Sequence, residues 1–115
     1  MLLTSFILFA ITAFFGLSNA GIREMTGRNP PAWLTMVHGL PAAAGLTLLL
    51  YATFAFGVAP LTIIALILFL VAAGGGATLN LAFHQRNRLL PRWLLYLHLV
   101  LAVSGFILLA IAVFA

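Results

Sequence analysis

The chain alternates between long apolar stretches and short connections, and this pattern predicts four membrane-spanning helices. An apolar stretch of roughly 20 residues lets a helix cross a hydrocarbon core of about 30 Å. The four predicted helices cover residues 2–19, 32–56, 61–83 and 92–114. Because short connections join successive helices, we expect an all-α, up-and-down bundle of four transmembrane helices in a single membrane domain.

The connections between these helices differ in character. Residues 20–31 and 84–91 are polar and contain asparagine and proline, which favour loops, whereas residues 57–60 form a tight, uncharged turn. The first apolar stretch is followed by small residues, as a signal peptide would be, but no positive charge precedes it. We therefore interpret it as the first transmembrane helix.

An internal repeat relates the two halves of the chain. Residues 1–55 align with residues 61–115 without a gap and share 17 identities in 55 pairs, where this composition alone would match roughly one pair in ten. Each unit is a two-helix hairpin, so both copies insert in the same orientation. This predicts two parallel-repeat hairpins related by a pseudo-two-fold axis along the membrane normal. Duplication of a stable hairpin without any attached function is the alternative interpretation.

Composition supports a membrane protein and restricts its chemistry. Hydrophobic residues make up 65% of the chain and charged residues 5%, against roughly 25% charged residues in a soluble domain. The absence of cysteine excludes disulfides and thiolate metal sites. Glu24 is the only acidic side chain, so catalysis by paired carboxylates is excluded within one chain.

The basic residues indicate the orientation in the membrane. All five are arginines in or beside the two polar connections: Arg23, Arg28, Arg86, Arg88 and Arg92. By the positive-inside rule these connections face the cytoplasm of a bacterial inner membrane, and both termini lie outside. The arginines therefore account for the high pI without a nucleic-acid partner.

Each half places one histidine inside an apolar helix. His38 and His98 occupy equivalent positions in the repeat, seven residues after Pro31 and Pro91, which is about 10 Å along a helix axis. A polar side chain at such a depth is costly and by default marks a functional site. A hydrogen bond from each histidine to a neighbouring helix is the structural alternative.

Small residues follow each histidine on the same helical face. Ala42 and Gly45 lie four and seven residues beyond His38, and Ala102 and Gly105 repeat this spacing in the second half. We expect this strip to form a flat slot beneath two facing imidazoles. Such a site suits one haem whose iron is bound by both histidines. Small residues are also common wherever membrane helices pack closely.

The haem propionates would then point to the cytoplasmic rim. The repeat supplies Arg28 and Arg88 there, with Arg92 nearby, and arginine binds carboxylates well. His84 is interpreted as a solvated side chain, with a propionate or quinone contact as the alternative. Its depth is too different from that of the other histidines for a three-histidine zinc site. Asn80 is expected to bond a neighbouring helix or to donate to a ligand.

The spacing H-x-x-x-A-x-x-G, which begins at His38 and again at His98, resembles that of the membrane-embedded b-type cytochromes. The resemblance implies a four-helix core that holds haem b between histidines of non-adjacent helices. The di-haem members need four ligating histidines, with one pair near each face, and this chain supplies one pair. The resemblance therefore implies a single haem near the cytoplasmic face, which by itself cannot relay electrons across the membrane.

These features predict an electron-transfer protein or subunit rather than a stand-alone enzyme. It would exchange electrons with a quinol, a soluble donor or partner subunits of a larger complex. Two histidine ligands would leave no open position on the iron for oxygen chemistry. The alternative is a cofactor-free structural or accessory subunit, acting with partner subunits or as a homodimer. A small multidrug exporter would need a glutamate in its first helix, where this chain has no ionisable residue.

Overall fold

Four long helices make up almost the whole chain. The computed structural model describes residues 1–115. Its helices are α1 (Leu2–Thr26), α2 (Ala32–Phe56), α3 (Pro60–Thr78) and α4 (Arg92–Phe114). The last turns of the third span are irregular, with a π-helical segment, η1 (Leu79–Phe83), and a 3₁₀ turn, η2 (His84–Arg86). The fold is all-α, as the hydrophobic pattern predicts.

The helix bounds differ from the expected ones in two places. Helix α1 continues through residues 20–26, beyond the end of its apolar stretch, because no proline occurs there and Gly21 keeps the helical conformation. Gly27 adopts a left-handed conformation with φ of 66°, which ends the helix. The third span, expected as one regular helix over 61–83, becomes π-helical from Leu79 onwards.

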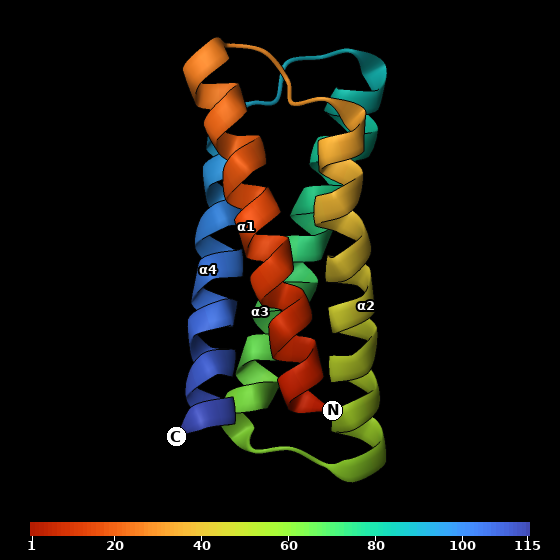
Figure 1. Ribbon diagram of the computed structural model, residues 1–115, viewed down its shortest axis with the longest axis vertical. Coiled ribbons are helices and arrows are strands. Elements are labelled where there is room, and N and C mark those ends of the chain that lie inside the picture. Colours follow the sequence, from red (N-terminus) through yellow and green to blue (C-terminus); the bar gives the residue numbers. More distant parts are fainter.

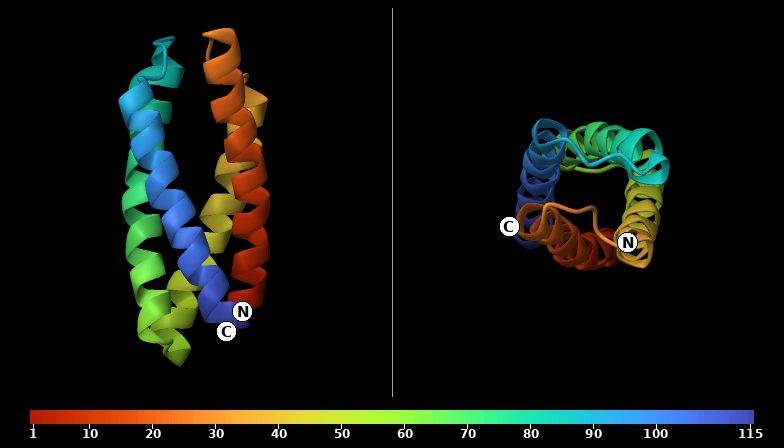
Figure 2. Two further views of the ribbon diagram at one scale, coloured as in Figure 1. Left: turned by 90° about the vertical axis from the view of Figure 1, so that its left-hand side faces the viewer. Right: turned by 90° about the horizontal axis from the view of Figure 1, so that it is seen from above.

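The helices form an up-and-down bundle with a square cross-section. Viewed along the long axis, α1 neighbours α2 and α4, and α3 neighbours the same two helices (Figure 2). The closest packing is within the hairpins α1–α2 and α3–α4. Both polar loops lie at one end of the bundle, and both termini and the α2–α3 turn lie at the other (Figure 1). We call these the loop end and the terminal end.

The surface of the bundle is suited to lipid. The molecule measures 42 × 20 × 19 Å, close to the thickness of about 40–45 Å of a whole bilayer. All four helices are long and apolar enough to cross a membrane, with mean hydropathies from 1.6 to 2.6 over their most apolar windows. Only 21 of 115 residues are buried, and large apolar side chains such as Phe54, 83% exposed, cover the outside. Such a surface is stable in hydrocarbon rather than in water.

A pair of stacked phenylalanines lies at the core of the bundle. Phe9 of α1 and Phe69 of α3, equivalent in the repeat, stack with ring centroids 3.9 Å apart and planes 3° from parallel. Leu49 and Leu109, a second equivalent pair, are fully buried in the same cluster. The internal repeat therefore continues into the packing, because equivalent side chains from the two hairpins meet in the core.

Candidate functional site

His38 and His98 face each other across one diagonal of the bundle. His38 lies on α2 and His98 on α4, and the two side chains are half-buried. Their ring centroids are 6.1 Å apart and their planes are 79° from parallel. The two helices are not neighbours in the square, so the histidines themselves form a contact between the two hairpins.

Both imidazoles are oriented by equivalent hydrogen bonds. His38 Nδ1 lies 2.9 Å from the Thr12 carbonyl oxygen of α1, and His98 Nδ1 lies 2.7 Å from the Ala72 carbonyl oxygen of α3. A carbonyl oxygen only accepts, so each Nδ1 is the protonated donor. In a neutral ring Nε2 then carries a free lone pair. No group of the chain hydrogen-bonds to either Nε2.

Two equivalent glycines make room for the histidine rings. A Cβ on Gly16 of α1 would stand 2.7 Å from Cε1 of His38, and a Cβ on Gly76 of α3 would stand 3.0 Å from Cε1 of His98. A side chain at Gly16 would force the His38 ring to shift, and one at Gly76 would press the His98 ring aside by a few tenths of an ångström. The two glycines therefore let each imidazole pack closely against the first helix of its own hairpin.

The small residues expected to form a slot are placed differently. Gly45 is covered by Phe9 and Gly105 by Phe69, each ring 3.2 Å from where a Cβ would be. Ala42 and Ala102 are half-buried on the same helices. The space next to the two glycines is thus filled by the phenylalanine stack and belongs to the core, so it is not an open slot.

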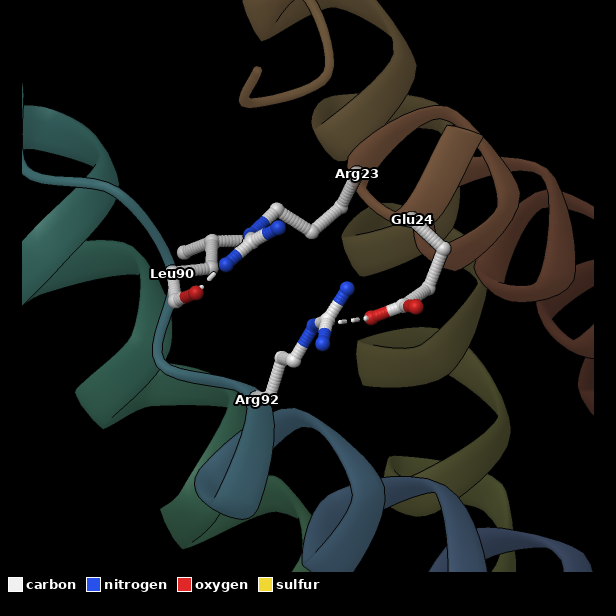
Figure 3. A network of polar contacts seen from close by, with 4 residues as sticks. All are labelled: Arg23, Glu24, Leu90 and Arg92. Atoms are coloured by element: carbon white, nitrogen blue, oxygen red, sulfur yellow. Dashed lines mark hydrogen bonds and ion pairs between the residues drawn. The ribbon is translucent and has the colours of Figure 1, made fainter. Parts of the chain in front are cut away.

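The arginines expected at the rim do not enter the bundle. Arg28 and Arg88 are exposed. Arg92, whose side chain is 64% exposed, forms an ion pair with Glu24, with Nε 3.0 Å from Oε1 (Figure 3). Glu24 Oε1 is buried and has no hydrogen-bond partner, so the contact with Arg92 is an ion pair alone. These three arginines therefore lie at the loop end without converging on the histidines.

Arg23 is the arginine that the structure buries. It is 7% exposed, and its Nε donates to the Leu90 carbonyl oxygen at 2.9 Å (Figure 3). Neither of its Nη groups forms a hydrogen bond with the protein. A related contact joins the hairpins in the opposite sense, because His84 Nε2 donates to the Pro30 carbonyl oxygen at 2.8 Å. Pro30 and Leu90 are equivalent in the repeat, so the two bonds close the loop end pseudo-symmetrically.

Asn19 of α1 is a further buried polar group near the loop end. It is 8% exposed, and its Nδ2 donates to the Leu34 carbonyl oxygen at 3.3 Å. Its Oδ1 is buried without a hydrogen-bond partner. An unsatisfied buried acceptor costs about 1–3 kcal/mol, a cost that a ligand or a water with a donor would remove.

The sequence identifies the two histidines but not the roles of Gly16, Gly76 and Arg23. Gly16 and Gly76 form one of the 17 identical pairs of the repeat, and their role depends on helix pairing within a hairpin. Arg23 looked like any other arginine of the loop, because its burial follows from the extension of α1. No family model matches the chain, and comparisons with curated proteins and with solved structures give no match.

Proposed function

We propose that the protein is a membrane electron-transfer protein or subunit that binds one haem b between His38 and His98. When bound, the haem supplies one-electron chemistry at its iron. The protein supplies two imidazoles whose ring centroids are 6.1 Å apart, apolar helices around them, and a polar rim at the loop end. A stand-alone enzymatic role is not part of this proposal.

The observation that carries the proposal is the relation of the two rings. Two imidazoles on opposite sides of one metal ion have centroids about 6 Å apart, given metal–nitrogen bonds of about 2 Å and the distance from each nitrogen to its ring centre. The centroids of His38 and His98 are separated by 6.1 Å. Both Nε2 atoms are free while both Nδ1 atoms donate to carbonyls, the arrangement that metal-binding histidines generally adopt.

The number of protein ligands favours haem over a bare metal ion. The chain has no group of three histidine, cysteine, aspartate or glutamate side chains able to hold a metal. A structural zinc site needs four protein ligands and a catalytic one three. A haem iron needs only two, because the macrocycle supplies the other four nitrogens.

The surroundings suggest which way the haem would lie. The stack of Phe9 and Phe69 fills the space beside Gly45 and Gly105. A porphyrin held by the two histidines would then extend toward the loop end, where it would have to displace side chains of the cluster formed by Leu79, Leu90, Leu94 and Leu95. Arg23, with free Nη groups, becomes the first candidate to bind a propionate, ahead of the exposed Arg28, Arg88 and Arg92.

The cellular placement follows from charge. We infer a bacterial inner membrane in which the arginine-bearing loop end faces the cytoplasm and both termini face the opposite side. Electrons would be exchanged at the cytoplasmic side, with a quinol, a soluble donor or partner subunits. A homodimer or a place in a larger complex is compatible with the small size of the chain.

The competing proposal is a cofactor-free accessory subunit. Such a subunit would use faces of small residues to pack against partner helices. Gly45 and Gly105 are covered from inside the bundle by Phe9 and Phe69. Partner binding would therefore have to use another face, and the free Nε2 pair would have no function in it.

An absorbance spectrum of the purified protein tests the proposal. We expect Soret and α bands in the dithionite-reduced wild type and their loss in the double variant His38→Ala/His98→Ala. His84→Ala is the matched control, because His84 bonds the Pro30 carbonyl and takes no part in the pair. Bands that persist in the double variant, or no bands after expression with added haem precursor, would refute the proposal.

A further inference from the structure

The pseudo-two-fold symmetry is broken on one side of the bundle. Where α4 meets α1, Ala20 packs against a buried cluster formed by Leu79, Leu90, Leu94 and Leu95. Arg92 forms its ion pair with Glu24 on the same side. Where α2 meets α3, the packing is looser and the equivalent face stays open. The π-helical segment η1 occurs only on this open side. Such segments are frequent at functional sites.

The open side forms a groove of about 270 Å³ between α2 and the irregular end of the third span. This is slightly below the range of about 300–1,000 Å³ found for ligand sites, so it suits a small head group rather than a whole ligand. Its wall on α2 includes Thr35, Met36, Gly39 and Leu40. Asn80, His84 and Gln85 complete it from the other side. Gly39 directly follows His38 in α2, so the groove and the histidine pair lie at a similar depth along this helix.

Three residues of the groove differ in size or polarity from their counterparts in the other half. Gly39 corresponds to Leu99, so a bulky side chain is missing only on the open side. Asn80 corresponds to Ala20, and Thr35 corresponds to Leu95. The two halves have therefore diverged at these positions in one direction, toward space and polarity within a membrane-spanning bundle.

Several polar groups in the groove are unused by the protein. The side-chain amides of Asn80 and Gln85 form no hydrogen bond within the chain, and His84 uses only Nε2, for the Pro30 carbonyl. Thr35 already donates to the Ala32 carbonyl. The free groups are thus two amides and one imidazole Nδ1, which together offer both donors and acceptors.

The chemistry of this lining selects a neutral ligand that enters from lipid. No arginine or carboxylate lines the groove, so nothing in it matches the phosphate of a phospholipid. Met36 and Leu40 are 59% and 64% exposed on the lipid side, and they would contact a hydrocarbon tail. A small ring with oxygen substituents would bind the amides and the imidazole.

We propose that this groove binds the head group of a quinone or quinol, with its tail in the surrounding lipid. Asn80 and Gln85 donate to the ring oxygens, His84 Nδ1 accepts from a hydroxyl, and Gly39 leaves space for the ring. Binding itself depends only on the groove. The role of the quinone as electron partner of the histidine site rests on the proposed haem function.

The test is photolabelling with an azido-benzoquinone that carries a decyl tail, followed by peptide mapping, on the full chain in lipid nanodiscs. We expect label within residues 32–40 and 79–85, and no label on the equivalent residues 92–100. Unlabelled decyl-benzoquinone should compete. Label that appears equally on both halves, or that excess phospholipid displaces as effectively, would overturn the proposal in favour of non-specific partition or a lipid site.

Two variants replace a groove residue by the residue at the equivalent position of the other half, which is Leu99 for Gly39 and Ala20 for Asn80. Each new side chain therefore already occurs at an equivalent position of the bundle. Gly39→Leu and Asn80→Ala should each lower labelling by about tenfold, as expected for loss of space or of one ligand hydrogen bond. Gly39 has no atom within 4 Å of an added Cβ, so the side chain of Gly39→Leu begins in open space. Gly74→Leu, which also enters open space, is the matched control and should label normally. Unchanged labelling in both groove variants would contradict the proposal.

The same labelling on His38→Ala/His98→Ala separates the two proposals. If the groove binds the quinone and the haem proposal fails, labelling persists in this variant and in the wild type, neither of which shows haem bands. If the haem proposal holds and the groove does not bind, the wild type has haem bands but no specific label.

Discussion

Gly16 of α1 lies so close to His38 of α2 that a single added methyl group would stand 2.7 Å from the imidazole Cε1. Gly76 of α3 repeats this relation with His98 at 3.0 Å. Each histidine ring is therefore fixed from two sides, by a glycine that sets its position and by a carbonyl oxygen that holds its Nδ1. The separation of the two rings is a property of the backbone of the two hairpins.

Gly16→Ala should displace the His38 ring and weaken haem binding by about tenfold or more. An added methyl that forces a packed ring aside costs about 1–3 kcal/mol, which exceeds the gain of about 1 kcal/mol from replacing a helical glycine by alanine. Haem affinity and thermal unfolding in detergent micelles measure both effects. In Gly74→Ala the added methyl group has no atom within 4 Å, so this variant measures the gain in helix stability alone. Equal haem affinity in the two variants would contradict this steric role.

The tautomers of the two histidines can be checked without any cofactor. Because Nδ1 of His38 and of His98 donates to a carbonyl, both neutral rings should carry the proton on Nδ1 and leave Nε2 free. Nitrogen-15 NMR of histidine-labelled protein distinguishes the protonated ring nitrogen from the unprotonated one. Protons on Nε2 in both rings would rule out the arrangement of ligands described above.

The phenylalanine stack should account for much of the association between the hairpins. Phe69→Ala removes a ring that stacks on Phe9 and covers Gly105, so we expect a loss of about 3–5 kcal/mol in the free energy of unfolding. Phe54→Ala, at an 83% exposed position, should change it by less than about 0.5 kcal/mol. Unfolding in mixed micelles compares the two variants. Similar losses of unfolding free energy in both variants would show that the stack does not stabilise the bundle more than an exposed phenylalanine does.

Arg23 should contribute more to stability than its neighbour Arg28. Arg23→Met leaves the Leu90 carbonyl without its donor in a buried setting, at a cost of about 1–3 kcal/mol. Arg28→Met alters an exposed side chain and should change the free energy of unfolding by at most about 0.5 kcal/mol. The same unfolding experiment distinguishes the two, and a larger effect for Arg28 would be inconsistent with the structure.

The architecture could be predicted from the sequence because two strong signals agree. Spans of about 20 apolar residues specify membrane helices, and a gapless repeat specifies two equivalent hairpins. Helices α2 and α4 span the expected residues because a proline precedes each of them, and α2 ends at Gly57. The extension of α1 was missed because hydropathy marks where a helix leaves the hydrocarbon, whereas Gly27 marks where its backbone ends.

The details of the site could be predicted only in part. His38 and His98 were found because a polar residue at matched depth in both halves is a local signal. Gly45 and Gly105 were expected to line a slot because of their spacing within α2 and α4. That spacing does not show that the neighbouring helix places Phe9 against Gly45 and Phe69 against Gly105. Contacts between helices depend on rotation about the helix axes, and a single sequence does not encode that rotation in any simple spacing.

The central claim is that His38 and His98 together bind one haem iron, and titration of the purified chain with haemin tests it most directly. We predict saturation at about one haem per chain, the stoichiometry of one bis-histidine site, with a low-spin spectrum. His38→Ala and His98→Ala should each lose the low-spin form, whereas His84→Ala should retain it. Weak, unsaturable binding in the wild type, or a low-spin spectrum that survives either single substitution, would contradict the account.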